Sequence, residues 1–142
     1  MQEAAARTEA LIAGLGHEEA VRRARSYVDA GADMVLVHSK QRTPTEIEAF
    51  VAAWDCAAPI VIVPTSYPQL DEARIAEIGK IGMVIYGNHA IRASVKGMRD
   101  AFRAIAAAGG AAGVADTIAS VDDVFALQEM DRVTADERRF LR

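Results

Sequence analysis

The sequence predicts an α/β fold, arranged as the C-terminal half of a (β/α)8 TIM-type barrel with parallel strands. Three short apolar runs, MVLVH (34–38), PIVIV (59–63) and MVIYG (83–87), are rich in Val and Ile and do not alternate with polar residues. Such runs are typical of strands that are covered on both faces. A helical pattern fills each gap between the runs, so the repeating unit is βα and the sheet is expected to be parallel.

The chain is too short for a complete barrel. A TIM barrel has eight βα units and needs ~200 residues or more, whereas these 142 residues hold three complete units. Residues 1–7 are interpreted as the end of a fourth strand. A small open α/β sheet is the alternative, but no GxGxxG or Walker pattern supports a nucleotide-binding version of it.

Two helices are predicted before the second apolar run. Residues 18–30 carry an apolar stripe and stop at Gly31, a residue suited to a helix C-terminus. The next helix begins in the stretch TPTE, where Pro44 suits the first helical position. Thr43 is expected to cap this helix and Glu46 to complete a capping box.

The later helices are marked by glycine, serine and apolar stripes. Residues 70–78 predict a shorter helix that ends at Gly79, and residues 90–107 predict a long one. Ser120 is expected to open a final helix.

Three segments follow from this pattern. They are a half barrel (1–108), a Gly/Ala-rich link (109–117) and a C-terminal helical segment (118–142). A helix that follows a flexible link often packs outside its own core, so the helical segment is expected to dock on a partner subunit.

Composition excludes several classes of protein. The formal net charge is −4, which does not resemble the basic footprint of a nucleic-acid binder. No apolar run reaches the ~18 residues that span a bilayer, and the N-terminus lacks the pattern of a secretory signal. Cys56 is the single cysteine, so no intrachain disulfide is possible and a cytoplasmic location is expected.

Polar side chains follow each strand at its C-terminal end, where parallel α/β folds bind ligands. By alternation, His38 shares a face with Met34 and Leu36 and points into the barrel mouth if that face is the interior. The candidate site residues are Arg7, His38, Ser39, Thr65 and Asn88. This set is rich in cations and hydrogen-bond donors, which suits an anionic ligand such as a carboxylate or a phosphoryl group.

Carboxylates are missing from the same edge. No Asp or Glu ends any of the three complete strands, and Glu9 is the only acid near the edge. Because Mg²⁺ takes oxygen ligands, usually carboxylates, no metal site is predicted within this chain.

Six segments, in order along nearly the whole chain, together resemble the phosphoenolpyruvate mutase family of the isocitrate lyase superfamily. They are ARTEALIAG (6–14), AGADMVLVHSK (30–40), PTEIEAF (44–50), PIVIVPTSYP (59–68), MVIYGNHAIRAS (83–94) and IASVDDVFALQEMD (118–131). The resemblance implies an α/β barrel whose eighth helix region is exchanged between subunits in a dimer of dimers. It also implies Mg²⁺ and a small 2-oxo acid substrate that bears an anionic group.

Two site residues match the family's pocket. Arg7 matches an arginine that contacts the oxo acid or its phosphoryl group, and His38 matches a histidine in the same pocket, so both are expected to be catalytic. In the family, the Mg²⁺ carboxylates, the serine-glycine substrate loop and the gating loop belong to the first half of the barrel. This chain is therefore expected to be inactive by itself and to assemble with other chains, since its strand edges lack partners.

The resemblance implies an isomerase that interconverts phosphoenolpyruvate and phosphonopyruvate, as in phosphonate biosynthesis. Hydrolysis of phosphonopyruvate and C–C cleavage of methylisocitrate-type substrates stay open, because the loop that separates these reactions lies outside the chain. A non-catalytic half-barrel module is the remaining alternative.

Overall fold

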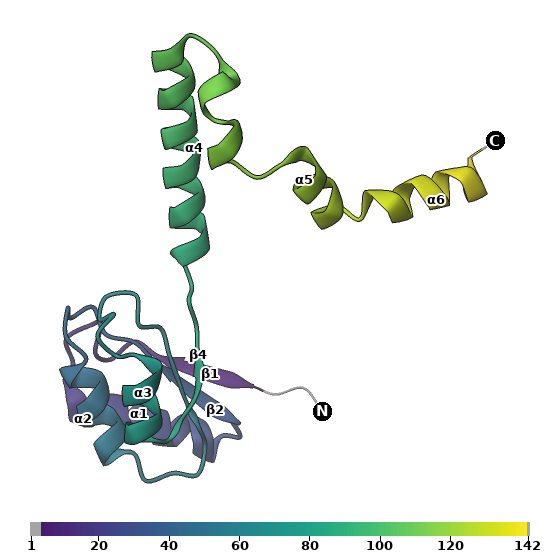
Figure 1. Ribbon diagram of the computed structural model, residues 1–142. Coiled ribbons are helices and arrows are strands. Elements are labelled where there is room, and N and C mark those ends of the chain that lie inside the picture. The colour runs from purple at the N-terminus through teal and green to yellow at the C-terminus, as the bar shows by residue number, and fades with distance from the viewer. Residues whose placement is uncertain (1–3, 142) are drawn as a thin grey trace. The chain divides into compact units, whose positions relative to one another are not determined.

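The computed structural model describes residues 4–141 (Figure 1). The elements are, in order, β1 (Ala5–Thr8), α1 (His17–Asp29), β2 (Met34–Val37), α2 (Thr45–Ala53), β3 (Ile60–Ile62), α3 (Glu72–Ile78), β4 (Ile81–Val84), α4 (His89–Ala108), two 3-10 turns (Ala111–Gly113 and Ala115–Thr117), α5 (Val121–Leu127) and α6 (Met130–Phe140). They form two compact units, Met1–Ala90 and Ile91–Arg142. The predicted boundaries near residues 108 and 117 stay a prediction.

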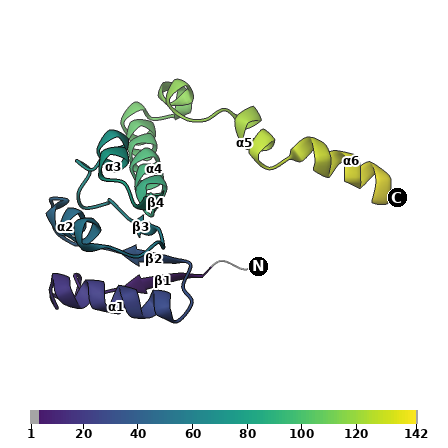
Figure 2. The ribbon, with the colours of Figure 1, turned by 90° about the horizontal axis from the view of Figure 1, so that it is seen from below.

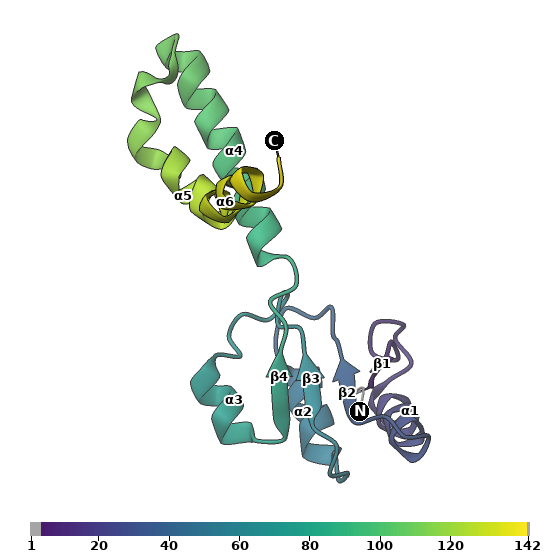
Figure 3. The same ribbon diagram turned by 90° about the vertical axis from the view of Figure 1, so that its right-hand side faces the viewer.

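The first unit is a four-stranded parallel sheet in the order β1-β2-β3-β4 (Figure 3). Each strand lies beside its neighbour in the chain, as in a barrel, whereas a doubly wound sheet reverses its strand order at a switch point. The register places Arg7 beside Leu36 and Thr8 beside Val37. The prediction of a parallel α/β fold is confirmed. Residues 5–8 form the predicted additional strand, and residues 1–3 of the predicted stretch lie outside the described residues.

The core lies between the sheet and helices α1 and α2; Figure 2 shows α1 running beside β1 and β2. Val35, Val37, Ile60 and Ile62 pack there against helix residues such as Phe50 and are fully buried. The Trp54 indole N–H donates to the carbonyl of Ala58 at 2.8 Å, so this buried ring has its polar atom satisfied. The β-branched side chains on the helix-facing side of the sheet thus meet the apolar faces of the helices, as the periods of strand and helix predict.

The other face of the sheet is only partly covered within the described residues. Met34 and Leu36 are half-buried, and Met83 is 46% exposed. The apolar runs predicted strands covered on both faces, and in this chain helices cover one. In a complete barrel the second face is the interior, which side chains from all eight strands fill.

The last strand begins earlier than predicted. The prediction placed it at 83–87, whereas β4 spans Ile81–Val84, because Lys80 and Ile81 already pair with Ile60. Ile60 pairs with Ile81 and Val61 pairs with Met83, so Gly82 is the extra residue of a bulge. A Cβ atom on Gly82 would lie 2.7 Å from the Cβ of Pro59, which explains the glycine at this position.

Three of the predicted helix ends are confirmed. Gly31 follows α1 with a positive φ of 101°, and Gly79 ends α3 with φ 69°. Ser120 caps α5 and forms a capping box with Asp123. The capping box predicted at Thr43 and Glu46 is wrong, because α2 has no side-chain cap and Glu46 bonds elsewhere.

The second unit consists of helices. α4 places Ile91, Val95, Met98 and Phe102 on one face, and these side chains are exposed. The predicted link 109–117 holds two 3-10 turns around Val114, which is 2% exposed. α6 (Met130–Phe140) follows α5, so the prediction that Ser120 opens the final helix is wrong. No helix within residues 4–141 is long and apolar enough to cross a membrane.

We expect Gly82→Ala to destabilise the sheet by about 1–3 kcal/mol, because the added methyl overpacks against Pro59. Urea unfolding followed by Trp54 fluorescence measures this. Gly97→Ala is the matched control: Gly97 lies inside α4 with nothing within 4 Å of an added Cβ, so this change is expected to leave the Trp54 transition unmoved. Equal midpoints for the two variants would contradict the steric account.

Candidate functional site

The candidate site lies at the C-terminal edge of the first unit's sheet. Arg7 is on β1, Glu9 follows it, and His38 comes directly after β2. Because Arg7 pairs in register with Leu36, it shares a face with Leu36 and His38. Val35 and Val37 are buried on the opposite face and His38 is half-buried, so the predicted alternation is confirmed.

Charges from the two strands act on His38. Burial lowers the pKa of His38 below its ordinary value of 6.5, and the Arg7 guanidinium lowers it further. Glu9 and a backbone hydrogen bond at Val63 act in the opposite direction. The imidazole is therefore neutral at pH 7, with one nitrogen able to donate and the other able to accept a hydrogen bond.

Polar atoms at this edge are left without partners. The Nδ1 atom of His38 and the hydroxyl of Tyr67 are buried and have no hydrogen-bond partner within residues 4–141. Burial raises the pKa of Tyr67 to about 12, with the nearby Val63 backbone opposing the shift. Since buried polar groups are normally satisfied, the unpartnered Nδ1 of His38 indicates where a ligand or further protein atoms complete the site; Tyr67 belongs to the core cluster, and His17 Nδ1, likewise unpartnered among the described residues, lies on α1.

Ser39 lies on the other face of the chain. It is fully buried on the helix side, where its hydroxyl donates to Glu46 Oε2 at 2.5 Å and accepts from the Gln41 N–H at 3.0 Å. Its hydroxyl is thus fully used in shaping the turn that follows His38. The placement does not support the expectation that Ser39 contacts substrate, and it explains why Glu46 does not cap α2.

Thr65 and Asn88 stand in the turns that follow β3 and β4. Thr65 is half-buried and Asn88 is exposed, and no side-chain hydrogen bond joins either to Arg7 or His38 within the described residues. Their predicted contact with substrate stays a prediction. Lys40 donates to the carbonyl of Ile12 at 2.9 Å and so ties the loop after β2 to the loop after β1.

Sequence reasoning noted Glu9 as an acid near the edge but did not include it in the site. The structure pairs its carboxylate with Arg7 Nε. The signal was available, because residues two apart on an extended chain share a face. The bond between Glu46 and Ser39 was missed for a different reason. Ser39 lies seven residues before Glu46 and outside α2, so helix spacing does not reveal the pair.

The donor set does not fit Mg²⁺. No group of three or more His, Cys, Asp or Glu side chains lies together within the described part of the chain. The Glu9 carboxylate at this edge already pairs with a guanidinium, and the Glu46 carboxylate accepts from Ser39. A metal ion would need oxygen ligands from outside these residues.

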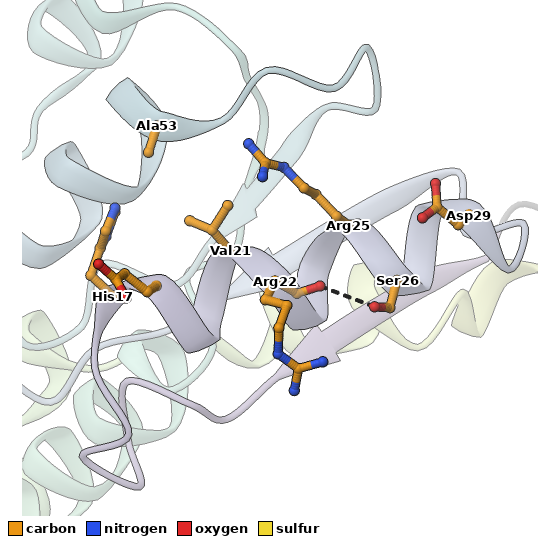
Figure 4. Close-up of a pocket in the computed structure, with 8 residues that line it drawn as sticks. His17, Val21, Arg22, Arg25, Ser26, Asp29 and Ala53 are labelled. Atoms are coloured by element: carbon orange, nitrogen blue, oxygen red, sulfur yellow. Dashed lines mark hydrogen bonds between the residues drawn. The ribbon is translucent and has the colours of Figure 1, made fainter.

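A groove of about 480 Å³ lies along α1 (Figure 4). Its lining includes His17, Arg22 and Arg25 of α1 and Ala53 of α2. Both arginines are already paired, Arg22 with Glu19 and Arg25 with Asp55. The groove holds none of the candidate site residues, and its cations are engaged, so the sheet edge is the better site.

Comparison with known proteins identifies the family of this chain. A family model described as phosphoenolpyruvate phosphomutase matches residues 4–106. The chain belongs to this family. The chain is 53% identical to the phosphonopyruvate hydrolase of Variovorax sp. (strain Pal2) over 96% of its own length and 47% of the relative. It is 41% identical to the phosphoenolpyruvate phosphomutase of Tetrahymena pyriformis, again over 96% of its length and 45% of the relative.

A solved structure gives the same picture. The crystal structure of a phosphonopyruvate hydrolase in complex with oxalate and Mg²⁺ matches with a TM-score of 0.91 and 52% identity, covering 99% of this chain and 50% of that one. The chain thus spans about half the length of the relatives it matches. The fold is half of the TIM-type barrel of the phosphoenolpyruvate phosphomutase family, as the sequence predicted.

We expect Ser39→Ala to cost about 1–3 kcal/mol, because it leaves the half-buried Glu46 carboxylate and the Gln41 N–H without their shared partner. Urea unfolding measures the loss. Thr43→Ala is the control and is expected to change stability by less than about 0.5 kcal/mol, since Thr43 makes no cap bond to α2. A larger loss for Thr43→Ala than for Ser39→Ala would restore the capping-box interpretation.

Proposed function

We propose that this chain is the part of a phosphonopyruvate-acting enzyme that supplies the arginine and histidine of its substrate pocket. The observation that supports this is the placement of the Arg7 guanidinium and the neutral His38 imidazole on one face at one sheet edge, in a chain of the phosphoenolpyruvate phosphomutase family. A guanidinium offers a fork to an anion, and a neutral imidazole can donate to a phosphoryl oxygen.

The chemistry proposed for the whole enzyme is transfer of a phosphoryl group away from carbon. The P–C bond of phosphonopyruvate breaks, its electron pair passes to the pyruvate enolate, and a P–O bond forms. Arg7 would offset charge on the phosphoryl oxygens or the oxo acid, and His38 would donate a hydrogen bond to the same group. Mg²⁺ would neutralise further charge when bound, with ligands from residues outside this chain.

The acceptor oxygen separates two reactions. If the enolate oxygen accepts the phosphoryl group, the product is phosphoenolpyruvate and the enzyme is an isomerase. If water accepts it, the products are pyruvate and phosphate. The 53% identity to a phosphonopyruvate hydrolase, against 41% to a phosphomutase, supports hydrolysis as a candidate equal to the isomerisation predicted from the sequence.

The test uses the native protein. An antibody to the C-terminal tail would isolate it from the source cells, intact mass would be compared with the 15.2 kDa of this chain, and phosphonopyruvate turnover with Mg²⁺ would be followed by ³¹P NMR. A phosphate ester product supports the isomerase and orthophosphate supports the hydrolase. Turnover by the recombinant 142-residue chain alone would contradict the proposal that the chain is incomplete as a catalyst.

In the native protein, we expect Arg7→Lys and His38→Asn each to lower kcat/KM by about 10²-fold or more, because Lys lacks the guanidinium fork and Asn cannot place its N–H where the imidazole donates. Arg25→Lys and His17→Asn change the same residue types in the α1 groove and are expected to stay within about twofold of the unmodified enzyme. If the site variants match these controls, the assignment of Arg7 and His38 to the pocket fails, whereas absence of phosphonopyruvate turnover by the native protein would favour C–C cleavage or a non-catalytic role.

We also propose that the chain works in the cytoplasm as a homo-oligomer, a dimer of dimers, through its C-terminal helices. The α4 stripe of exposed apolar side chains, including Ile91, Met98 and Phe102, supports an interface on this unit. Size-exclusion chromatography with light scattering of the 142-residue chain is expected to show a dimer or larger species. A monodisperse monomer would count against the proposal.

A further inference from the structure

His38 begins a loop, residues 38–44, that lies outside every helix and strand. Strand pairing reaches Val37 on both sides, where Val37 pairs with Thr8 of β1 and with Ile62 of β3. His38 is thus the first residue beyond the paired sheet. The direction of its imidazole therefore depends on the conformation of the loop as well as on the register of the strands.

Ser39, the next residue, anchors this loop. It is fully buried on the helix side. Its hydroxyl donates to Oε2 of Glu46, in the first turn of α2, at 2.5 Å and accepts from the Gln41 N–H at 3.0 Å. The first distance is in the range of hydroxyl–carboxylate hydrogen bonds, and the second bond closes a turn within the loop. One hydroxyl thus joins the end of β2, the loop and the start of α2.

The groups that act electrostatically on His38 belong to other elements. Burial and the Arg7 guanidinium lower the pKa of His38, whereas Glu9 and the Val63 backbone raise it. Glu46 is not among these groups, so any influence of its carboxylate on His38 passes through the hydrogen bond to Ser39. The lowered pKa of His38 reports that the ring is held in a partly buried place near Arg7.

We propose that Ser39 and Glu46 act together as positioning residues for this site. Their hydrogen bond ties the loop after β2 to α2 and so holds the His38 imidazole at the sheet edge, on the face that it shares with Arg7. The proposal rests on the proposed function of His38 as a residue of the substrate pocket. Ser39 and Glu46 themselves would not touch the ligand, because their bond lies on the helix side of the chain.

The test is the pH titration of the His38 ring, followed by NMR in the folded 142-residue chain. We expect Ser39→Ala to move this titration upward toward 6.5, because a loosened loop weakens the burial and the influence of Arg7 that together lower the pKa. His38→Asn identifies the His38 signal, and the rings of His17 and His89 serve as references in the same spectra. A role in folding energy alone would lower the urea midpoint and leave the His38 titration of the folded chain unmoved.

Two changes at Glu46 separate the hydrogen bond from the charge. Glu46→Ala removes the acceptor, so we expect it to raise the His38 titration as Ser39→Ala does. Glu46→Gln keeps an amide oxygen that can accept from the Ser39 hydroxyl, so its titration is expected to match that of the unmodified chain. Glu48→Ala is the matched control and should not move the titration, because Glu48 lies on the same helix but pairs with Arg74 at 2.9 Å.

The contrast between Glu46→Ala and Glu46→Gln decides the matter if Ser39→Ala does not fold. His38 titrations that match the Glu48→Ala control in both Ser39→Ala and Glu46→Ala would overturn the proposal.

The failure of this proposal can be told from failure of the proposed function. Unmoved titrations in Ser39→Ala and Glu46→Ala, with a loss of turnover in His38→Asn of the native protein, would remove the positioning role and leave the pocket in place. Raised titrations with full turnover in His38→Asn would leave the tie between loop and helix in place and remove the function of His38.

Discussion

The parallel register between β1 and β2 is the constraint on which the candidate site depends. It sets Arg7 beside Leu36, and the period of two along each strand then brings Arg7, Glu9 and His38 to one face at one edge. A slip by one residue would turn Arg7 toward the helices and Thr8 toward the site. Burial on the helix side opposes such a slip, because it would move the Arg7 guanidinium into the core and expose Thr8, which is fully buried. The core therefore fixes the geometry of the site.

The same alternation divides the polar residues after β2 between two tasks. His38 is left at the sheet edge with an unpartnered Nδ1, whereas Ser39 is buried and bonded to Glu46 and Gln41. The Ser39 bonds shape the turn from which His38 projects. His38 and Ser39, which stabilises the loop of His38, are thus adjacent in sequence and opposite in direction.

The apolar face opposite the helices has a physical consequence for the whole protein. Met34, Leu36 and Met83 lie on it with partial exposure, and both edge strands of the sheet have a free side among the described residues. Exposed strand edges and apolar faces favour association. The match to about half the length of each relative agrees with a sheet that further strands would complete.

The sequence by itself determined the strands, the parallel sheet, most helix ends and the family. These features are local: a period of two, a glycine with positive φ at Gly31, or Ser120 three residues before Asp123 can be seen within one element. Only the tertiary structure decided which partners the polar side chains take. Glu46 suits a capping box by spacing, yet Ser39 lies within its reach and takes its carboxylate. Gly82 has no room for a side chain because of Pro59, a neighbour across the sheet that no local pattern reveals. Hydrogen bonds and close contacts depend on distances in space, and those distances arise only when the strands have paired.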